Sequence, residues 1–121
     1  MFKFLFTSSM LALAGIAIAQ EYSFYGQARP YGAEGVETSP CQCDNVPIGG
    51  AAFASSIRQE LGKDLCCAKV TVGSGDGRVQ TVFNAICDSC SVHDIALEIE
   101  SWTTLTDKKE GPVPIFWTAK V

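Results

Sequence analysis

Short apolar stretches alternate with turn residues along most of this chain, which is the pattern of a protein built from short β-strands. Two stretches rich in β-branched residues, 70–72 and 79–86, flank the Gly-rich segment 73–77 and predict a β-hairpin. Other apolar or aromatic runs bounded by turn residues predict further strands at 21–26, 49–54, 95–97 and 113–121. Pro112 and Pro114 predict an edge or a bulge for the last strand.

Apolar residues also recur at helical spacing in two places. Phe53, Ile57 and Leu61 predict a short helix over 55–62, in which two serines can cap the start and a glycine can form the end. A second short helix is predicted over 98–105, with acidic residues near its start. Six short strands and two short helices in about a hundred residues predict a small β-barrel.

The first residues have a different character from the rest. Lys3 precedes an apolar run over 4–18, and small residues at the end of this run form a cleavage motif before Gln20. The pattern predicts a secretory signal peptide over 1–19 and one mature domain over 20–121. The apolar run is too short for a membrane anchor. We therefore expect a secreted, extracellular monomer with no membrane association after signal cleavage.

The six cysteines all follow the predicted cleavage site. They are Cys41, Cys43, Cys66, Cys67, Cys87 and Cys90. An even number of cysteines in an exported protein predicts three disulfides, and the adjacent Cys66 and Cys67 are expected to have different partners. The pairing is otherwise open. A zinc site on Cys87, Cys90 and His93, together with Cys66 and Cys67, is the disfavoured alternative, so we expect no metal and no other cofactor.

The net charge restricts the classes of partner that the protein can bind. The chain has 13 Asp and Glu against 9 Lys and Arg, a formal net charge of −4. An acidic chain argues against nucleic acid or an anionic membrane as partner, because both require a basic face.

The segment 27–49 is rich in Gly, Pro, Ser and charge and is long for a loop, so we expect it to be functional or held by its cysteines.

The aromatic residues divide into two groups. Trp102 on the apolar face of the second helix and Trp117 in the closing strand are expected in the core. Tyr22, Tyr25 and Tyr31 stand beside the long loop and are expected to be exposed contacts for a ligand.

An ordered series of motifs resembles a known superfamily. Five segments carry it: 23–26, 51–53, 66–72, 87–90 and 111–117. They are similar to the T-x-Y-G, A-A-L, C-G-K-x-V-x-V, C-P-G-C and closing-strand motifs of secreted double-psi β-barrels. This superfamily includes rare lipoprotein A-like domains, the first domain of expansins, barwin and family 45 glycoside hydrolases. Cys67 stands where the motif usually has glycine. The resemblance implies an all-β, six-stranded double-psi β-barrel with two short helices and disulfide staples.

The resemblance also points to a groove. In lytic and loosening members, an aspartate before the CxxC corner and another in a D-L-S strand face each other, as proton donors for a glycosidic bond must. Here Ala85 and Ala96 hold these positions, and an alanine methyl cannot transfer a proton. Ser23 is expected to keep the hydroxyl of the groove threonine. No confident catalytic residue follows, and binding without cleavage is expected.

Three functions are therefore compatible with the sequence. The first is a non-catalytic, expansin-like protein that binds cell-wall polysaccharide or an extracellular host surface. The second is a wall-loosening or lytic protein that uses Asp94 and Asp88 as displaced acids. The third is a secreted effector or cysteine-protease-inhibitor-like module that binds a protein through the 27–49 loop. The residues expected in the groove or at the ligand are Ser23, Tyr25, Asp88, His93 and Asp94.

Overall fold

The computed structural model describes residues 20–44, 46 and 49–121, so the predicted signal peptide lies outside the described residues. The strands are β1 (Glu21–Pro30), β2 (Thr38–Pro40), β3 (Ala51–Ala54), β4 (Lys69–Ser74), β5 (Gly77–Cys87), β6 (Ile95–Leu97) and β7 (Val113–Lys120). The helices are α2 (Ile57–Leu61) and α3 (Ile99–Leu105). Within the described residues, no helix has the length and apolar character needed to cross a membrane.

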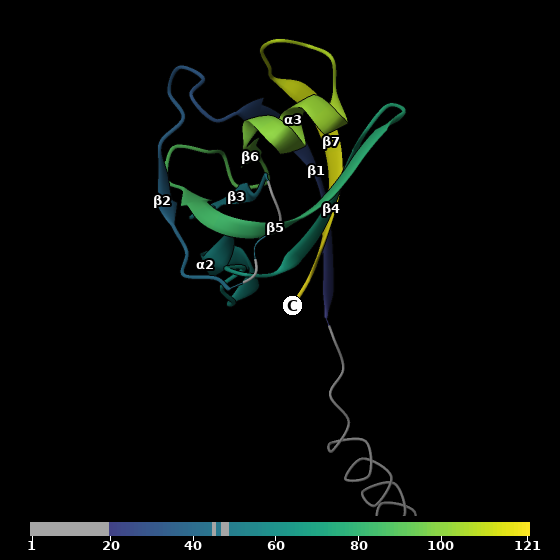
Figure 1. Cartoon of the computed structure of the whole chain (residues 1–121). Coiled ribbons are helices and arrows are strands. Elements are labelled where there is room, and N and C mark those ends of the chain that lie inside the picture. The colour runs from purple at the N-terminus through teal and green to yellow at the C-terminus, as the bar shows by residue number, and fades with distance from the viewer. Residues whose placement is uncertain (1–19, 45, 47–48) are drawn as a thin grey trace, which may run out of the picture.

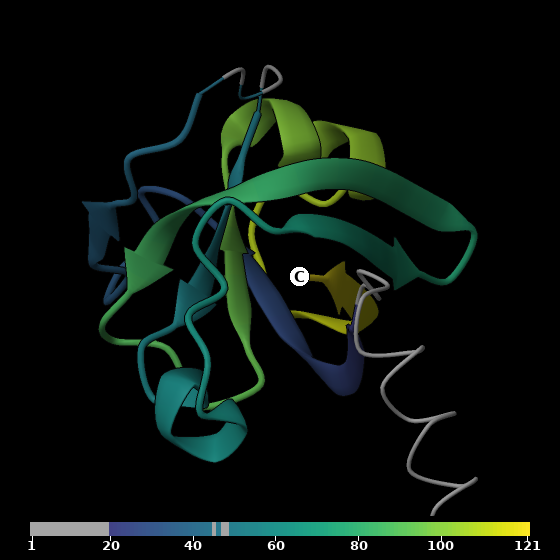
Figure 2. The same cartoon turned by 90° about the horizontal axis from the view of Figure 1, so that it is seen from below.

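The strands form one sheet in the order β2-β5-β3-β6-β1-β7-β4. Because β4 also pairs with β5, six strands close into a barrel, and β2 pairs with β5 outside this ring (Figure 1). The pairs β1–β6 and β3–β5 are parallel, and the other pairs are antiparallel. A view from below shows α2 and α3 on opposite sides of the barrel (Figure 2). The predicted six-stranded barrel with two helices is confirmed.

Local signals explain the ends of several elements. Gly62 ends α2 as predicted, with a left-handed φ of 68° and its N–H donated to the carbonyl of Arg58 at 2.8 Å. Ser56 holds the N-cap position, but its side chain makes no capping hydrogen bond. Gly75, with a φ of 58°, allows the tight turn between β4 and β5 that the Gly-rich segment predicted.

The first strand is longer than the sequence predicted. β1 continues through Gly26 to Pro30, so the early part of the expected 27–49 loop is strand. A Cβ at Gly26 would lie only 2.1 Å from the carbonyl oxygen of His93. The glycine therefore marks a close approach between two backbone segments and does not end the strand.

The closing strand β7 is not an edge strand, which corrects the prediction made from its prolines. It pairs with β1 along its length and with β4 from Phe116 onward. Pro114 lies before the first β4 pair, Gly73 with Phe116. The missing N–H of proline is tolerated there because only one neighbouring strand is paired at that point.

The interior of the barrel is filled by inward-facing side chains from all six strands of the ring and from α3. Trp102 and Trp117 are 1% and 0% exposed, as predicted. The indole N–H of Trp117 donates to the carbonyl of His93 at 2.8 Å, and that of Trp102 donates to the carbonyl of Lys108 at 2.7 Å. Both polar ends are thus satisfied, which makes burial of these large rings favourable.

An irregularity in β5 changes which residues face the core. Ala51 of β3 pairs with Phe83, but the next pair is Ala52 with Ala85, so Asn84 has no partner on β3. A bulge of this kind shifts the alternation of the strand by one residue. As a result, Phe83 belongs to the main core, whereas Ala85 belongs to a second, smaller cluster.

The six cysteines form three disulfides, as predicted. The pairs are Cys41–Cys66, Cys43–Cys67 and Cys87–Cys90. The neighbours Cys66 and Cys67 go to different partners, and together they fix the segment after β2 against the start of β4. No thiolate is left for the alternative zinc site, since the structure has no free cysteine.

Cys67 stands at a position where the similar motif usually has glycine, and its backbone conformation shows why glycine is favoured there. Cys67 has a φ of 70°, which places a Cβ-bearing residue in the left-handed region. With Cys43→Ser as background, Cys67→Gly is expected to be more stable than Cys67→Ser by about 1 kcal/mol, because glycine adopts this φ without a steric penalty. Urea denaturation of the two double variants measures the difference. Equal stabilities would contradict a left-handed backbone at residue 67.

Candidate functional site

Three alanines on neighbouring strands form a flat patch on the outside of the barrel, which we call the alanine row. Ala85 of β5 pairs with Ala52 of β3, and Ala52 pairs with Ala96 of β6. The bulge turns Ala85 outward, and the register then aligns it with Ala96. The two positions at which the resemblance expects acids therefore share one surface, with β3 between them.

This surface is covered by the segment that follows β1. Tyr31 and Val36 pack on the cluster that contains the alanine row. As a result, Ala85 is 6% exposed, and Ala52 and Ala96 are 0% exposed. Tyr31 is partly exposed, and not fully exposed as Tyr25 is, because its ring packs on these small side chains.

Hydrogen bonds hold Tyr31 in this place. Its hydroxyl donates to Oδ1 of Asn84 at 3.5 Å, and Nδ2 of Asn84 donates to Oε1 of Glu98 at 2.9 Å. The backbone N–H of Tyr31 donates to the carbonyl of Leu97 at 2.8 Å. Burial, and secondarily the charge of Glu98, raise the pKa of Tyr31 above its ordinary value of about 10. The phenol is therefore a protonated donor at neutral pH.

The hydrogen-bonded group of Tyr31, Asn84 and Glu98 was not predicted from the sequence. One signal was present in the glycine pair before β3. A Cβ at Gly50 would lie 2.3 Å from the side-chain amide of Asn84, so only glycine leaves room for that amide. The pair therefore indicates a side chain pressed against the backbone.

The two acids considered as substitutes have other partners. Oδ1 of Asp94 accepts the backbone N–H of Gln27 at 2.9 Å, and Oδ2 of Asp88 accepts the hydroxyl of Ser39 at 3.3 Å. Asp94 is thus bound to β1 and Asp88 to β2, two strands that β5, β3 and β6 separate in the sheet. Both contacts are of the kind that fixes a turn or a strand end.

Ser23 does not lie beside the alanine row. Its Oγ is 2.9 Å from Oγ1 of Thr118 on β7. The β1 residue opposite Ala96 is Arg29, because β1 runs on past the predicted end of the strand. Ser23 therefore lies further along β1 than the residue opposite Ala96, and its expected contact with a ligand stays a prediction.

His93 makes contacts between elements. Its ring stacks on Phe24 of β1, with centroids 4.3 Å apart, and its Nε2 lies 2.8 Å from Oε2 of Glu60 in α2. Both the ring face and Nε2 are thereby occupied. In the described part of the chain, no group of three His, Cys, Asp or Glu side chains is placed to hold a metal ion.

A second surface, which we call the outer face, is formed by outward-pointing residues of β1, β7, β4 and β5. They lie in three rows across the strands: Glu21–Lys120–Lys69–Val82, Ser23–Thr118–Thr71–Gln80 and Tyr25–Phe116–Gly73–Arg78. Tyr25 is 78% exposed and Phe116 is 43% exposed, with ring centroids 4.8 Å apart. Part of the face is an open hollow of about 520 Å³. Tyr25 is thus exposed as predicted.

Solved structures contain the same kind of barrel. An apo expansin of Clavibacter michiganensis matches with a TM-score of 0.63 and 22% identity over 81% of this chain and 50% of that chain. The fold is similar to that of bacterial expansin. A mutant of the same expansin in complex with cellohexaose matches with a TM-score of 0.64 and 21% identity over the same shares.

The expansin-like fold predicted from the motifs is therefore confirmed. This chain spans about half the length of the expansin chains that it matches. No protein-family model and no curated protein matches the sequence.

Replacing Tyr31 with Phe tests whether its phenol is buried over the alanine row. A folded-state pKa raised above about 10 makes the unfolded chain release this proton first, so wild-type stability should fall as the pH rises past 10. Tyr31→Phe should lose stability less steeply over that range and differ by under about 1 kcal/mol at pH 7. Urea denaturation at several pH values measures both slopes. Parallel slopes would mean that the phenol is in water.

Replacing Ala85 tests whether the alanine row is closed to solvent. Ala85→Asp should be less stable than Ala85→Asn by about 2 to 4 kcal/mol at pH 7, because burial penalises the charged carboxylate more than the neutral amide of similar shape. Burial raises the pKa of such a carboxyl, so the gap should shrink as the pH falls toward about 4. Thermal melting of both variants between pH 7 and about pH 4 measures this difference in stability. Equal melting at pH 7 would mean an open surface.

Proposed function

We propose that this protein is a secreted, non-catalytic protein that binds extracellular polysaccharide. One observation carries the proposal: the two positions at which the resemblance expects proton donors are Ala85 and Ala96, and both are buried under Tyr31 and Val36. Buried alanine methyls at these two positions cannot protonate a glycosidic oxygen.

The remaining acids do not replace the missing pair. Glycoside hydrolysis by two carboxyl groups requires them to flank one bond at about 5 to 9.5 Å from each other. Asp94 and Asp88 are instead fastened to β1 and β2 by hydrogen bonds. Glu98 lies near the alanine row, but its carboxylate accepts the amide of Asn84.

Two observations support polysaccharide as the ligand. The fold is similar to that of an expansin, a mutant of which is known in complex with cellohexaose. The outer face presents Tyr25 and Phe116 beside a row of hydroxyl and amide side chains. Exposed aromatic rings next to hydrogen-bonding groups match the alternating apolar and hydroxyl surfaces of a sugar.

Disulfide content supports an extracellular location. The protein has three disulfides and no free cysteine. Disulfides of this kind persist in oxidising compartments and are rare in the cytosol. The predicted signal peptide over 1–19 agrees with export.

A combined binding and hydrolysis assay tests the proposal. The folded protein should be retained on insoluble cell-wall polysaccharide, whereas the reduced and unfolded protein should not be. The retained protein should release no reducing sugar, and Asp94→Asn should leave retention unchanged. Reducing-sugar release that Asp94→Asn abolishes would favour the displaced-acid enzyme. No retention on any polysaccharide tested would contradict the proposed function.

A further inference from the structure

The outer face combines charges in a way that the stability of the fold does not require. Lys69 of β4 lies directly opposite Lys120 of β7. Like charges in cross-strand pairs are destabilising. Glu21 offsets part of this repulsion, with its Oε1 3.8 Å from Nζ of Lys120, but this pair is more than half exposed and therefore weak.

A third cation lies at the other end of the same face. Arg78 of β5 pairs with Gly73, in the row that also holds Tyr25 and Phe116. Gly73, the partner of Arg78, lies four positions after Lys69 on β4, which is about 13 Å along the strand. A small anion cannot contact both positions, whereas a polymer with repeating negative charges can.

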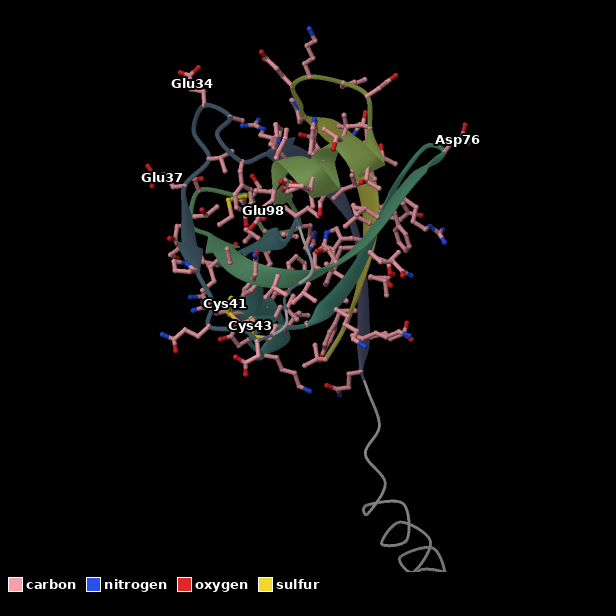
Figure 3. All side chains as sticks on the ribbon, viewed as in Figure 1. Glu34, Glu37, Cys41, Cys43, Asp76 and Glu98 are labelled. Carbon is pink, nitrogen blue, oxygen red and sulfur yellow. A yellow bond between two sulfur atoms is a disulfide. The ribbon has the colours of Figure 1, made fainter. Side chains whose placement is uncertain are left out.

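The charge of this face is opposite to that of the rest of the chain. The three cations are accompanied by Glu21, the single acid in the three rows. The whole chain carries 13 acidic residues and a formal net charge of −4. Asp76 lies at the tip of the β4–β5 hairpin and points away from the barrel (Figure 3). The outer face is thus a local positive surface on an acidic protein, and local charge complementarity selects anionic ligands.

The uncharged side chains of the face narrow the chemistry of the ligand. Between the two ends lie the hydroxyls of Ser23, Thr118 and Thr71 and the amide of Gln80. Such groups both donate and accept hydrogen bonds, as sugar hydroxyls do. The rings of Tyr25 and Phe116 are tilted by 49° to each other, so they do not form the single plane that a crystalline polysaccharide surface would require.

We infer that the outer face binds a single chain of an acidic polysaccharide, one that bears uronate carboxylates. Lys69 and Lys120 pair with a carboxylate at one end of the bound segment, and Arg78 pairs with another at the opposite end. Tyr25 and Phe116 contact a sugar ring, and the hydroxyl row binds the sugars between. This inference rests on the proposed function, and it places binding on a surface separate from the covered alanine row.

Affinity electrophoresis of the mature protein tests this assignment, with polygalacturonate as the acidic probe and hydroxyethyl cellulose as the neutral one. Polygalacturonate should retard the protein, and retardation should fall at least about fivefold between low and physiological salt, as ion pairs are screened. Lys69→Gln with Lys120→Gln should weaken binding about tenfold. Lys69→Arg with Lys120→Arg should retain it. Tyr25→Ala should weaken it about fivefold.

The matched control is Lys108→Gln with Lys109→Gln, which makes the same change in net charge outside the outer face. This control should bind polygalacturonate as the wild type does. An equal loss in the control would overturn the assignment, because net charge alone would then explain the effect. A different result would overturn the inference but not the proposed function. In that case the protein binds the neutral probe and not the acidic one, and Lys69→Gln with Lys120→Gln leaves this binding unchanged. Failure to bind either soluble probe or any insoluble polysaccharide would overturn both.

Discussion

The bulge at Asn84 is the constraint on which both outer surfaces of this barrel depend. β5 takes part in the ring twice, with β4 along its first half and with β3 along its second half. Without the extra residue, Ala85 would continue the inward alternation of Val79 and Phe83. The bulge turns it outward, which aligns it with Ala52 and Ala96 and frees the side chain of Asn84 to meet Tyr31.

The two surfaces have opposite properties because their side chains differ in size. The alanine row consists of methyl groups, and a second layer of Tyr31 and Val36 packs on it and excludes water. On the outer face, the corresponding positions are long or polar, and no described segment covers them. Tyr25 and Tyr31 illustrate the difference. Tyr25 on the outer face is 78% exposed, whereas Tyr31 is partly buried where it packs on the alanine row.

Much of the fold was predictable because it follows from local patterns. The β4–β5 hairpin, the strand at 95–97, both helices and the burial of the two tryptophans correspond to turn residues and apolar spacing. The ordered motifs predicted the barrel. They also usually have glycine at the position of Cys67, and glycine readily adopts the left-handed φ that Cys67 has.

The arrangement of the site was less predictable, because it depends on register. The odd-numbered positions from Val79 to Cys87 are all buried, on both sides of the bulge, so their small or apolar character gives no sign of it. Gly26 resembled a strand end, since a close approach to the distant backbone of His93 leaves no local trace. Because β1 continues past Gly26, Arg29 and not Ser23 stands opposite Ala96. Local patterns also could not predict that Tyr31 covers the alanine row, because this contact depends on the bulge.

The barrel has an expansin-like fold, and Tyr31 covers the surface on which the resemblance expects proton donors. Nuclear Overhauser spectroscopy of residues 20–121 in solution measures this packing. We expect cross-peaks between the ring protons of Tyr31 and the methyl protons of the alanine row. A Tyr31 ring without such cross-peaks, beside alanine methyls that contact water, would contradict it.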